Sequence, residues 1–263
     1  MNEYEQIVRD LLQNGYAYMP IDSVLVSNAS QAADKFLQSL DGDYERWALT
    51  RTGEEEPQLG VITKSKAQGF DEKLYVHVPH DLAYKVSLSG IRETPQQLVC
   101  LRLMNKLHDA LKSISLNLSY ELAEQGAIEP ELYNTVVHTF RMSEPYNVST
   151  LRFLFYHDVP DQTGAKAHYD KSFFSIHLGD DGGELWIKDA SGAWIRASPP
   201  AGSALVFFGV KVLEATGGIY RPILHKSTTV PGKDRKAAVM FVHVDIGHEV
   251  RSAEEEYQRF FAQ

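Results

Sequence analysis

The sequence predicts a mainly β fold with α additions, in which a jelly-roll core is preceded and flanked by helices, one of them long. Apolar residues recur at helical spacing in much of the first half, and short strand-like segments separated by Gly, Pro, Asp and Ser follow. A length of 263 residues fits one domain of this class. We therefore expect a single domain, 1–263, with a helical N-terminal portion containing irregular loops (1–145), a jelly-roll core (146–247) and a C-terminal helix (248–263).

The charge balance excludes some classes of partner. The chain carries 26 Lys and Arg against 35 Asp and Glu, a formal charge of −9, whereas nucleic acids and anionic membranes select clustered positive charge. Its one cysteine, Cys100, excludes an intramolecular disulfide. The N-terminus lacks the pattern of a secretory signal, and no apolar run approaches the ~18 residues of a membrane span. We expect a cytoplasmic protein with a small-molecule substrate, and the sequence leaves its oligomeric state open.

The first 90 residues predict two helices and then a poorly patterned stretch. Five apolar side chains at helical spacing predict the first helix, which ends at Asn14-Gly15: Tyr4, Ile7, Val8, Leu11 and Leu12. A short extended run follows at 16–19, and a second helix is predicted around 33–40. Residues 41–85 have little periodicity and include the acidic run 54–56, so we expect loops with one or two short strands.

A long helix is predicted from residue 95 to about 125. Thr94 can cap its first turn, Pro95 suits the first helical position, and Gln97 can complete a capping box. Apolar residues then follow on one face until Gly126. Such a helix is about 46 Å long at 1.5 Å per residue, enough to run along the flank of a domain. A shorter helix is expected near 130–140.

Eight short strands are predicted in the second half. Their ranges are 150–156, 167–170, 173–178, 184–188, 193–197, 204–208, 223–230 and 236–245. Eight strands of this length fit a double-sheet jelly roll, a fold with an open mouth at one end. A short amphipathic helix with apolar residues from Val250 to Phe261 closes the chain.

One His-x-Asp motif can be completed into a metal site. Side chains two apart on a strand point the same way, so His168 and Asp170 can bind one metal ion. His225 lies on a later predicted strand and supplies the second imidazole of a two-His, one-carboxylate triad, which is typical of ferrous iron. A second pair, His243 and Asp245, has only His248 after it and is read as a strand end leading into a turn.

A basic residue follows ten positions after His225. Arg235 borders the apolar run 237–241, where a guanidinium requires a carboxylate or a similar acceptor. A dicarboxylate cosubstrate bound to the metal could supply that carboxylate. An arginine at a turn, facing water, is the simpler alternative.

These residues resemble a known family, the iron(II)- and 2-oxoglutarate-dependent oxygenases, in its isopenicillin N synthase-like branch. That branch reads His-x-Asp, a Gly-Leu-Gln-Val-like strand, Trp, Pro, Gly-Ala-Leu-Val, Leu-Glu, Thr-Asn-Gly-x-Tyr, His-Arg-Val and Arg-x-Ser. The corresponding segments here, in the same order, are 168–170, 183–187, Trp194, Pro200, 202–206, 213–214, 216–220, 225–227 and 235–237. The segment 151–156 is similar to the family's Leu-Arg-x-Asn-Tyr-Tyr strand.

The resemblance implies a double-stranded β-helix, as this jelly roll is called, and a cofactor set of Fe(II), 2-oxoglutarate as cosubstrate and dioxygen. It makes His168, Asp170 and His225 the iron ligands, and Arg235 and Tyr156 the partners of 2-oxoglutarate, with no catalytic residue beyond the metal ligands. The implied reaction is hydroxylation of a small organic molecule, or its desaturation or cyclisation, with release of succinate and carbon dioxide. Because Asp170 occupies the carboxylate position, halogenation is not expected.

Departures from the family pattern leave two alternatives open. The family's Ser after the Arg is Ala237 here, and its Asn before the Tyr is Leu154. Both changes remove polar contacts near the expected cosubstrate, so an iron-dependent oxidase of the same fold that does not use 2-oxoglutarate is one alternative. A non-catalytic β-barrel binding protein is the other. The primary substrate is not identified by the sequence; its recognition is expected to involve residues 41–93 and the loops at the barrel mouth.

Overall fold

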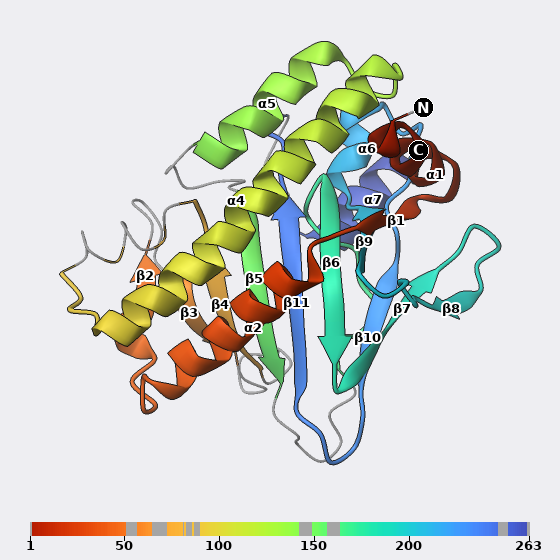
Figure 1. Cartoon of the computed structure of the whole chain (residues 1–263). Helices are drawn as coiled ribbons and strands as arrows, with labels where there is room; N and C mark the ends of the chain where they lie inside the picture. Colours follow the sequence, from red (N-terminus) through yellow and green to blue (C-terminus); the bar gives the residue numbers. More distant parts are fainter. Residues whose placement is uncertain are drawn as a thin grey trace.

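The computed structural model combines two antiparallel sheets with helices, which confirms the expected jelly-roll class (Figure 1). The acidic run 54–56 and Val250 lie outside the described residues. The structure describes residues 2–50, 57–64, 73–80, 82, 86, 90–141, 149–156, 164–246 and 252–261.

The larger sheet has eight strands in the order β1-β9-β6-β11-β5-β4-β3-β2. Their bounds are β1 Tyr16–Pro20, β2 Ala48–Thr50, β3 Pro57–Lys64, β4 Lys73–Val78, β5 Thr150–Tyr156, β6 Phe174–Asp181, β9 Ser203–Phe208 and β11 Arg235–Val242. The smaller sheet has the order β10-β7-β8. Its strands are β7 Gly183–Lys188, β8 Trp194–Arg196 and β10 His225–Thr229.

Seven of the eight strand segments predicted for the second half are confirmed, and one is wrong. Residues 167–170 contribute only an isolated bridge between His168 and His225. The chain bends at 171–173, so that the ladder stops before Asp170. The carbonyl oxygen of Asp170 instead accepts a hydrogen bond of 2.8 Å from the backbone N–H of Val210.

The first and the long helix begin and end where the local chemistry predicts, whereas the second helix, predicted around 33–40, begins earlier, at Ser23 after its cap Asp22. Gly15 follows the first helix with a φ of 80°, a left-handed conformation that glycine adopts readily. The capping box of the long helix is complete: Gln97 N–H donates to Thr94 Oγ1 over 3.2 Å, and Thr94 N–H donates to Gln97 Oε1 over 2.8 Å. No helix in the described parts of the chain is long and apolar enough to cross a membrane. The helices are α1 Glu3–Asn14, α2 Ser23–Gln38, α4 Pro95–Glu124, α5 Pro130–Arg141, α6 Lys211–Ala215 and α7 Ala253–Phe261, with a 3-10 turn at Glu45–Trp47.

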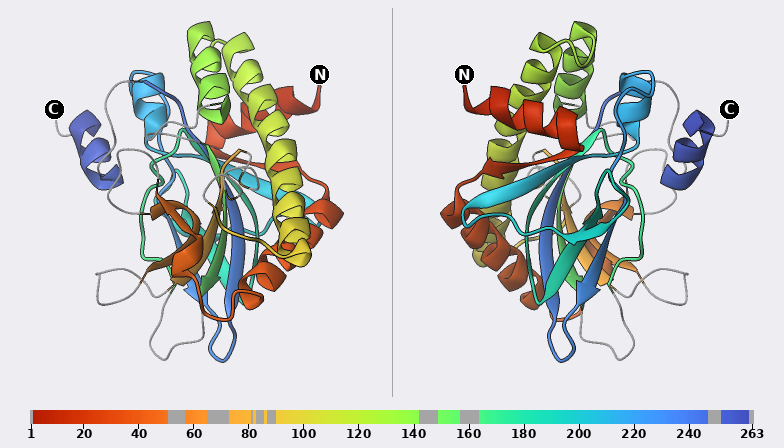
Figure 2. Two further views of the ribbon diagram at one scale, coloured as in Figure 1. Left: turned by 90° about the vertical axis from the view of Figure 1, so that its left-hand side faces the viewer. Right: turned by 90° about the vertical axis from the view of Figure 1, so that its right-hand side faces the viewer.

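Helices cover one face of the large sheet and leave the other to a cavity. α2 and α4 cross the face formed by β5, β11 and β6, as Figure 1 and the side views of Figure 2 show. β5 alternates between the two sides: Leu151, Phe153 and Phe155 join the main hydrophobic core, whereas Arg152 and Tyr156 face the cavity. The large sheet therefore separates the hydrophobic core on one face from the cavity on the other.

Residues 41–85 contribute more strand than expected. β2, β3 and β4 extend the large sheet beyond β5, where one or two short strands were predicted. β4 directs Leu74 and Val76 into the core, and Tyr75 and His77 towards the cavity. Since β1 also pairs with β9, the N-terminal portion shares one sheet with the later strands.

Candidate functional site

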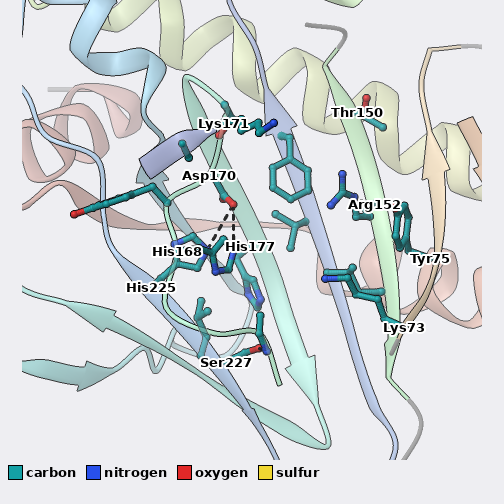
Figure 3. Close-up of a pocket in the computed structure, with 18 of the residues that line it drawn as sticks. Lys73, Tyr75, Thr150, Arg152, His168, Asp170, Lys171, His177, His225 and Ser227 are labelled. Carbon is teal, nitrogen blue, oxygen red and sulfur yellow. Dashed lines mark hydrogen bonds and ion pairs between the residues drawn. The ribbon is translucent and has the colours of Figure 1, made fainter. Parts of the chain in front are cut away.

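One cavity of about 700 Å³ brings together the residues that the sequence singles out. His168, Asp170, His225, Arg235 and Tyr156 all line it, although they come from separate parts of the second half of the chain. Figure 3 shows the first three of them. It opens between the two sheets, on the face of the large sheet that the helices leave free.

His168, Asp170 and His225 converge on one point. The Nε2 atoms of His168 and His225 lie 3.7 and 3.6 Å from Asp170 Oδ1. The two histidines are held together by a pair of backbone hydrogen bonds of 2.9 and 3.0 Å. The Asp170 and His225 side chains are only 8% and 7% exposed, and His168, at 45%, is the ligand at the open side.

Backbone carbonyls orient both imidazoles. His168 Nδ1 lies 2.7 Å from the carbonyl oxygen of Lys166, and His225 Nδ1 lies 3.1 Å from that of Ile223. These contacts place the ring proton on Nδ1 and leave the Nε2 lone pair facing Asp170. Burial lowers the pKa of His225 to about 4, although Asp170 opposes this shift, so the ring is neutral and able to bind a metal ion at pH 7.

Ser175, five residues after Asp170, orients the Asp170 carboxylate. Ser175 Oγ donates a hydrogen bond of 2.5 Å to Asp170 Oδ2, which leaves Oδ1 facing the histidines. Burial raises the pKa of Asp170, but His225, His168, Ser175 and Arg152 together lower it below its usual value. Two imidazoles and one carboxylate on one side of a cavity are a donor set that suits ferrous iron with positions left open.

We predict that Ser175→Ala weakens ferrous iron binding by about 10- to 100-fold, because an unsupported carboxylate loses its orientation. Titration of the metal-free protein with Fe(II) under anaerobic conditions measures this change. Ser119→Ala is the matched control, since Ser119 is also fully buried and hydrogen-bonded, to the carbonyl of Ser115 on α4. Equal iron affinities of the Ser175 and Ser119 variants would contradict the role given to Ser175.

Arg235 is buried in the same cavity and already has a carboxylate neighbour. Its side chain is 3% exposed; Nη2 lies 2.5 Å from Asp180 Oδ1, and the guanidinium lies 4.8 Å from the centre of the Tyr156 ring. His177 Nε2 lies 3.1 Å from the other Asp180 oxygen. The sequence reasoning left this acceptor to a cosubstrate and overlooked Asp180. Arg235 Nε and Nη1, however, have no hydrogen-bond partner among the described residues.

Gly183 leaves the space in which the Arg235 side chain lies. A Cβ atom at this position would lie 2.5 Å from Arg235 Cδ and 2.5 Å from the carbonyl oxygen of Thr228. We predict that Gly183→Ala lowers the free energy of unfolding by about 1–3 kcal/mol, as overpacking does. Urea denaturation measures the loss, and an unchanged midpoint would show that Arg235 has room to move.

The two departures from the family pattern face each other. Leu154 and Ala237 are cross-strand partners on β5 and β11, and both belong to a small apolar cluster with Tyr156 and Val239. An apolar pair thus replaces a polar pair, and neither position leaves a buried polar atom without a partner.

Other parts of the cavity wall carry signals that the sequence reasoning did not use. Arg152 on β5, with Tyr75 and His77 on β4, lies across the cavity from the His168, Asp170 and His225 group (Figure 3). Period-two alternation in β4 could have identified the last two. On the strand that follows the His-x-Asp motif, His177 lines the cavity, whereas the preceding Phe173 lies in the main core.

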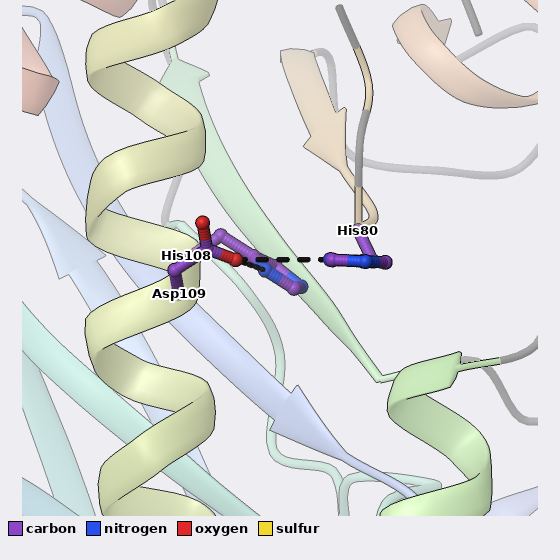
Figure 4. A group of neighbouring side chains, drawn as sticks. All are labelled: His80, His108 and Asp109. Carbon is purple, nitrogen blue, oxygen red and sulfur yellow. Dashed lines mark ion pairs between the residues drawn. The ribbon is translucent and has the colours of Figure 1, made fainter. Parts of the chain in front are cut away.

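The rejected His-x-Asp pair does not form a second centre. His243 lines the cavity, but Asp245 lies away from it, with its Oδ2 3.7 Å from His138 Nδ1. A different group of possible ligands, His80, His108 and Asp109, lies outside the cavity lining, where α4 meets the segment after β4 (Figure 4).

Comparisons with known proteins agree with this geometry. Residues 147–244 match the 2OG-Fe(II) oxygenase superfamily. The fold is similar to a putative oxygenase of Shewanella oneidensis (17% identity, 98% of this chain and 94% of that chain, TM-score 0.70). It is also similar to a putative 2OG-Fe(II) oxygenase family protein of Caulobacter crescentus (20%, 99% and 93%, TM-score 0.69). A third similar structure is the dioxygenase for auxin oxidation 1 of Arabidopsis thaliana with 2-oxoglutarate (16%, 94% and 89%, TM-score 0.72). No curated protein matches the sequence.

Proposed function

Because residues 147–244 belong to the 2OG-Fe(II) oxygenase superfamily, we propose that this chain oxidises a small organic molecule, with His168, Asp170 and His225 as the iron ligands. Hydroxylation is the reaction expected, with desaturation or cyclisation as variants. The observation that supports this best is the pair of imidazoles held by backbone carbonyls, with both Nε2 atoms within 3.7 Å of one Asp170 oxygen.

Iron held by His168, Asp170 and His225 would supply the oxidising chemistry, in which 2-oxoglutarate and dioxygen are consumed and succinate and carbon dioxide are formed. The chain's own residues orient the iron ligands and exclude water from them. Lys166 and Ile223 hold the two histidines through their carbonyls, and Ser175 holds the carboxylate. Phe207 lies against His225, with ring centres 4.8 Å apart, and keeps water from its buried side.

Arg235 is the proposed partner of the distal carboxylate of 2-oxoglutarate. Its Nε and Nη1 are the atoms left for such a carboxylate, since Nη2 contacts Asp180. Tyr156 lies under the guanidinium and is the proposed second contact. The apolar pair Leu154 and Ala237 reduces the polar contacts on this side, so Arg235 carries most of the recognition.

Absorption and product analysis test the proposal against its alternatives. Anaerobic protein loaded with Fe(II) should develop a visible charge-transfer band on addition of 2-oxoglutarate and should form succinate when oxygen is admitted. Iron binding without the band and without succinate would instead favour an oxidase that does not use 2-oxoglutarate. Failure to bind iron, with the metal content unchanged in His168→Ala, would leave only a non-catalytic binding protein.

Two further expectations stay predictions: the isopenicillin N synthase-like branch and the cytoplasmic location. The absence of a nucleic-acid partner also stays a prediction, since it depends on the net charge of −9 alone. The segments of 41–93 that were expected to recognise substrate contribute Lys73, Tyr75 and His77 to the cavity wall, which supports that expectation.

A further inference from the structure

We propose that Arg152 forms the anion subsite for the primary substrate, so that the substrate is a small carboxylic acid held across the cavity from the iron ligands. This inference rests on the proposed function of the cavity and adds the class of substrate to it.

Arg152 is held in place but lacks a carboxylate partner. Its Nε donates a hydrogen bond to His77 Nε2, and its guanidinium lies 4.8 Å from the centre of the Tyr75 ring and 4.6 Å from that of Phe241. No carboxylate of the described chain forms an ion pair with it. A partly buried guanidinium without such a partner is costly, so it is typically matched by a bound anion.

Strand alternation turns this side chain into the cavity. Arg152 lies between Thr150 and Leu154 on the face of β5 that lines the cavity, opposite His77 on β4 and Val239 on β11. Figure 3 shows it facing the His168, Asp170 and His225 group from the far wall. A substrate anchored here by one end would place the rest of its body near the metal ligands.

The charge of the cavity favours an anion. Among the described residues that line it, five are Lys or Arg and only one, Asp170, is acidic, in a chain whose net charge is −9. Asp170 is committed to the metal group, and Arg235 is matched by Asp180. Arg152 therefore adds positive charge to a cavity wall with few acidic side chains among the described residues, which favours an anionic ligand.

The geometry favours a carboxylate. Two aromatic rings hold the guanidinium while Nε is occupied by His77, so the terminal nitrogens are the ones left for a ligand. A planar two-oxygen group matches this fork better than a single charge does. The volume of about 700 Å³ must also accept 2-oxoglutarate, which limits the acid to a small molecule.

The test compares acids with their amides. Phenylacetate, benzoate and hexanoate are each compared with the corresponding primary amide, by their effect on the Fe(II)–2-oxoglutarate absorption band and on succinate formation. We expect at least one acid, and no amide, to perturb the band. In Arg152→Gln the half-saturating concentration of that acid should rise at least tenfold, whereas that of 2-oxoglutarate should rise less than twofold. Arg152→Lys should restore only part of the loss.

A matched control and three contrary results complete the test. Lys226→Gln removes a cation from an aromatic ring outside the cavity lining, 4.5 Å from the centre of Trp194, and should leave acid binding unchanged. Equal binding of acid and amide would overturn the proposal, as would the lack of any response to all three acids. Loss of 2-oxoglutarate binding in Arg152→Gln but not in Arg235→Gln would overturn it too, because Arg152 would then hold the cosubstrate. If wild-type protein gives no band at all, the proposed function fails, and saturation-transfer NMR of phenylacetate with metal-free protein still tests the subsite.

A second group points to a structural metal site, on independent grounds. We propose that His80, His108 and Asp109 bind a zinc-like divalent cation. The Nδ1 atoms of His80 and His108 lie 3.7 and 3.6 Å from Asp109 Oδ1, the same spacing as in the first group (Figure 4). Two imidazoles and a carboxylate, with water as a fourth ligand, form a common zinc coordination set.

The buried histidine is the observation that requires a ligand. His108 is 1% exposed, and neither ring nitrogen has a hydrogen-bond partner among the described residues. Buried polar atoms are normally satisfied, and a cation at Nδ1 would satisfy one of them. Asp109 is 61% exposed and gives the ion access from solvent.

Metal titration in a background without the first centre tests this site. In His168→Ala/His225→Ala, we expect one equivalent of Zn(II) to bind, and Co(II) to give the visible bands of a four-coordinate ion. His80→Ala and Asp109→Asn, at partly exposed positions, should each abolish this binding. His138→Ala is the control, because His138 has the same spacing to a carboxylate, Asp245, without a second histidine. No bound zinc in the background protein, or zinc binding that survives both variants, would overturn the proposal.

Discussion

Asp170→Ala is expected to abolish succinate formation while the fold survives. Asp170 Oδ1 is the one atom close to both Nε2 atoms, so its removal takes away a ligand and the charge that balances the metal. A loss of several kcal/mol in binding and transition-state stabilisation corresponds to about a thousandfold or more in rate. Succinate release, with iron content measured in parallel, detects this loss.

The metal-free variant should be as stable as the wild type or more stable. Asp170 is buried next to the two histidines for a functional purpose, and such sites generally lower stability. Asp245→Ala is the control, since Asp245 also lies 3.7 Å from a histidine but outside the cavity lining. Full iron content and turnover in Asp170→Ala would exclude the His168, Asp170 and His225 group as the reaction centre.

Local chemistry accounts for the parts of the fold that the sequence predicted well. Thr94, Pro95 and Gln97 form a helix start that is readable within four residues, and both of its hydrogen bonds are present. β5 matches its predicted range, 150–156, because a short run rich in aromatic and other apolar residues specifies it. His168 and Asp170 are close because they are two residues apart in an extended segment, although only His168 makes a bridge.

Long-range partners were predicted less well, because no local pattern specifies them. Asp180 lies beyond the predicted strand 173–178, and only the pairing of β6 with β11 brings it to Arg235. Arg152 was identified only as part of the family-like segment 151–156, because only the pairing of β5 with β4 brings Tyr75 and His77 next to it. β4 itself lay in a weakly patterned stretch, so residues 41–93 were expected to recognise substrate but no pattern identified which of their side chains form the cavity wall.

Arg235 has two roles that experiment can separate: it pairs with the buried Asp180, and it is the proposed partner of 2-oxoglutarate. Arg235→Met would leave the Asp180 carboxylate, 7% exposed, without its guanidinium partner, and should lower the free energy of unfolding by about 3–5 kcal/mol. The double variant Arg235→Met/Asp180→Leu removes both charges and should regain most of that loss. Urea denaturation of the wild type, both single variants and the double variant gives the coupling energy directly.

The double variant then isolates the role proposed for Arg235 in binding 2-oxoglutarate. It should fold and bind iron, since His168, Asp170 and His225 are unchanged, but the charge-transfer band should need far more 2-oxoglutarate. Asp180→Leu alone leaves Arg235 without its acidic neighbour, so added 2-oxoglutarate should stabilise this variant more than it stabilises the wild type. If the double variant binds 2-oxoglutarate normally, Arg235 serves only to neutralise Asp180, and the distal carboxylate is held elsewhere in the cavity.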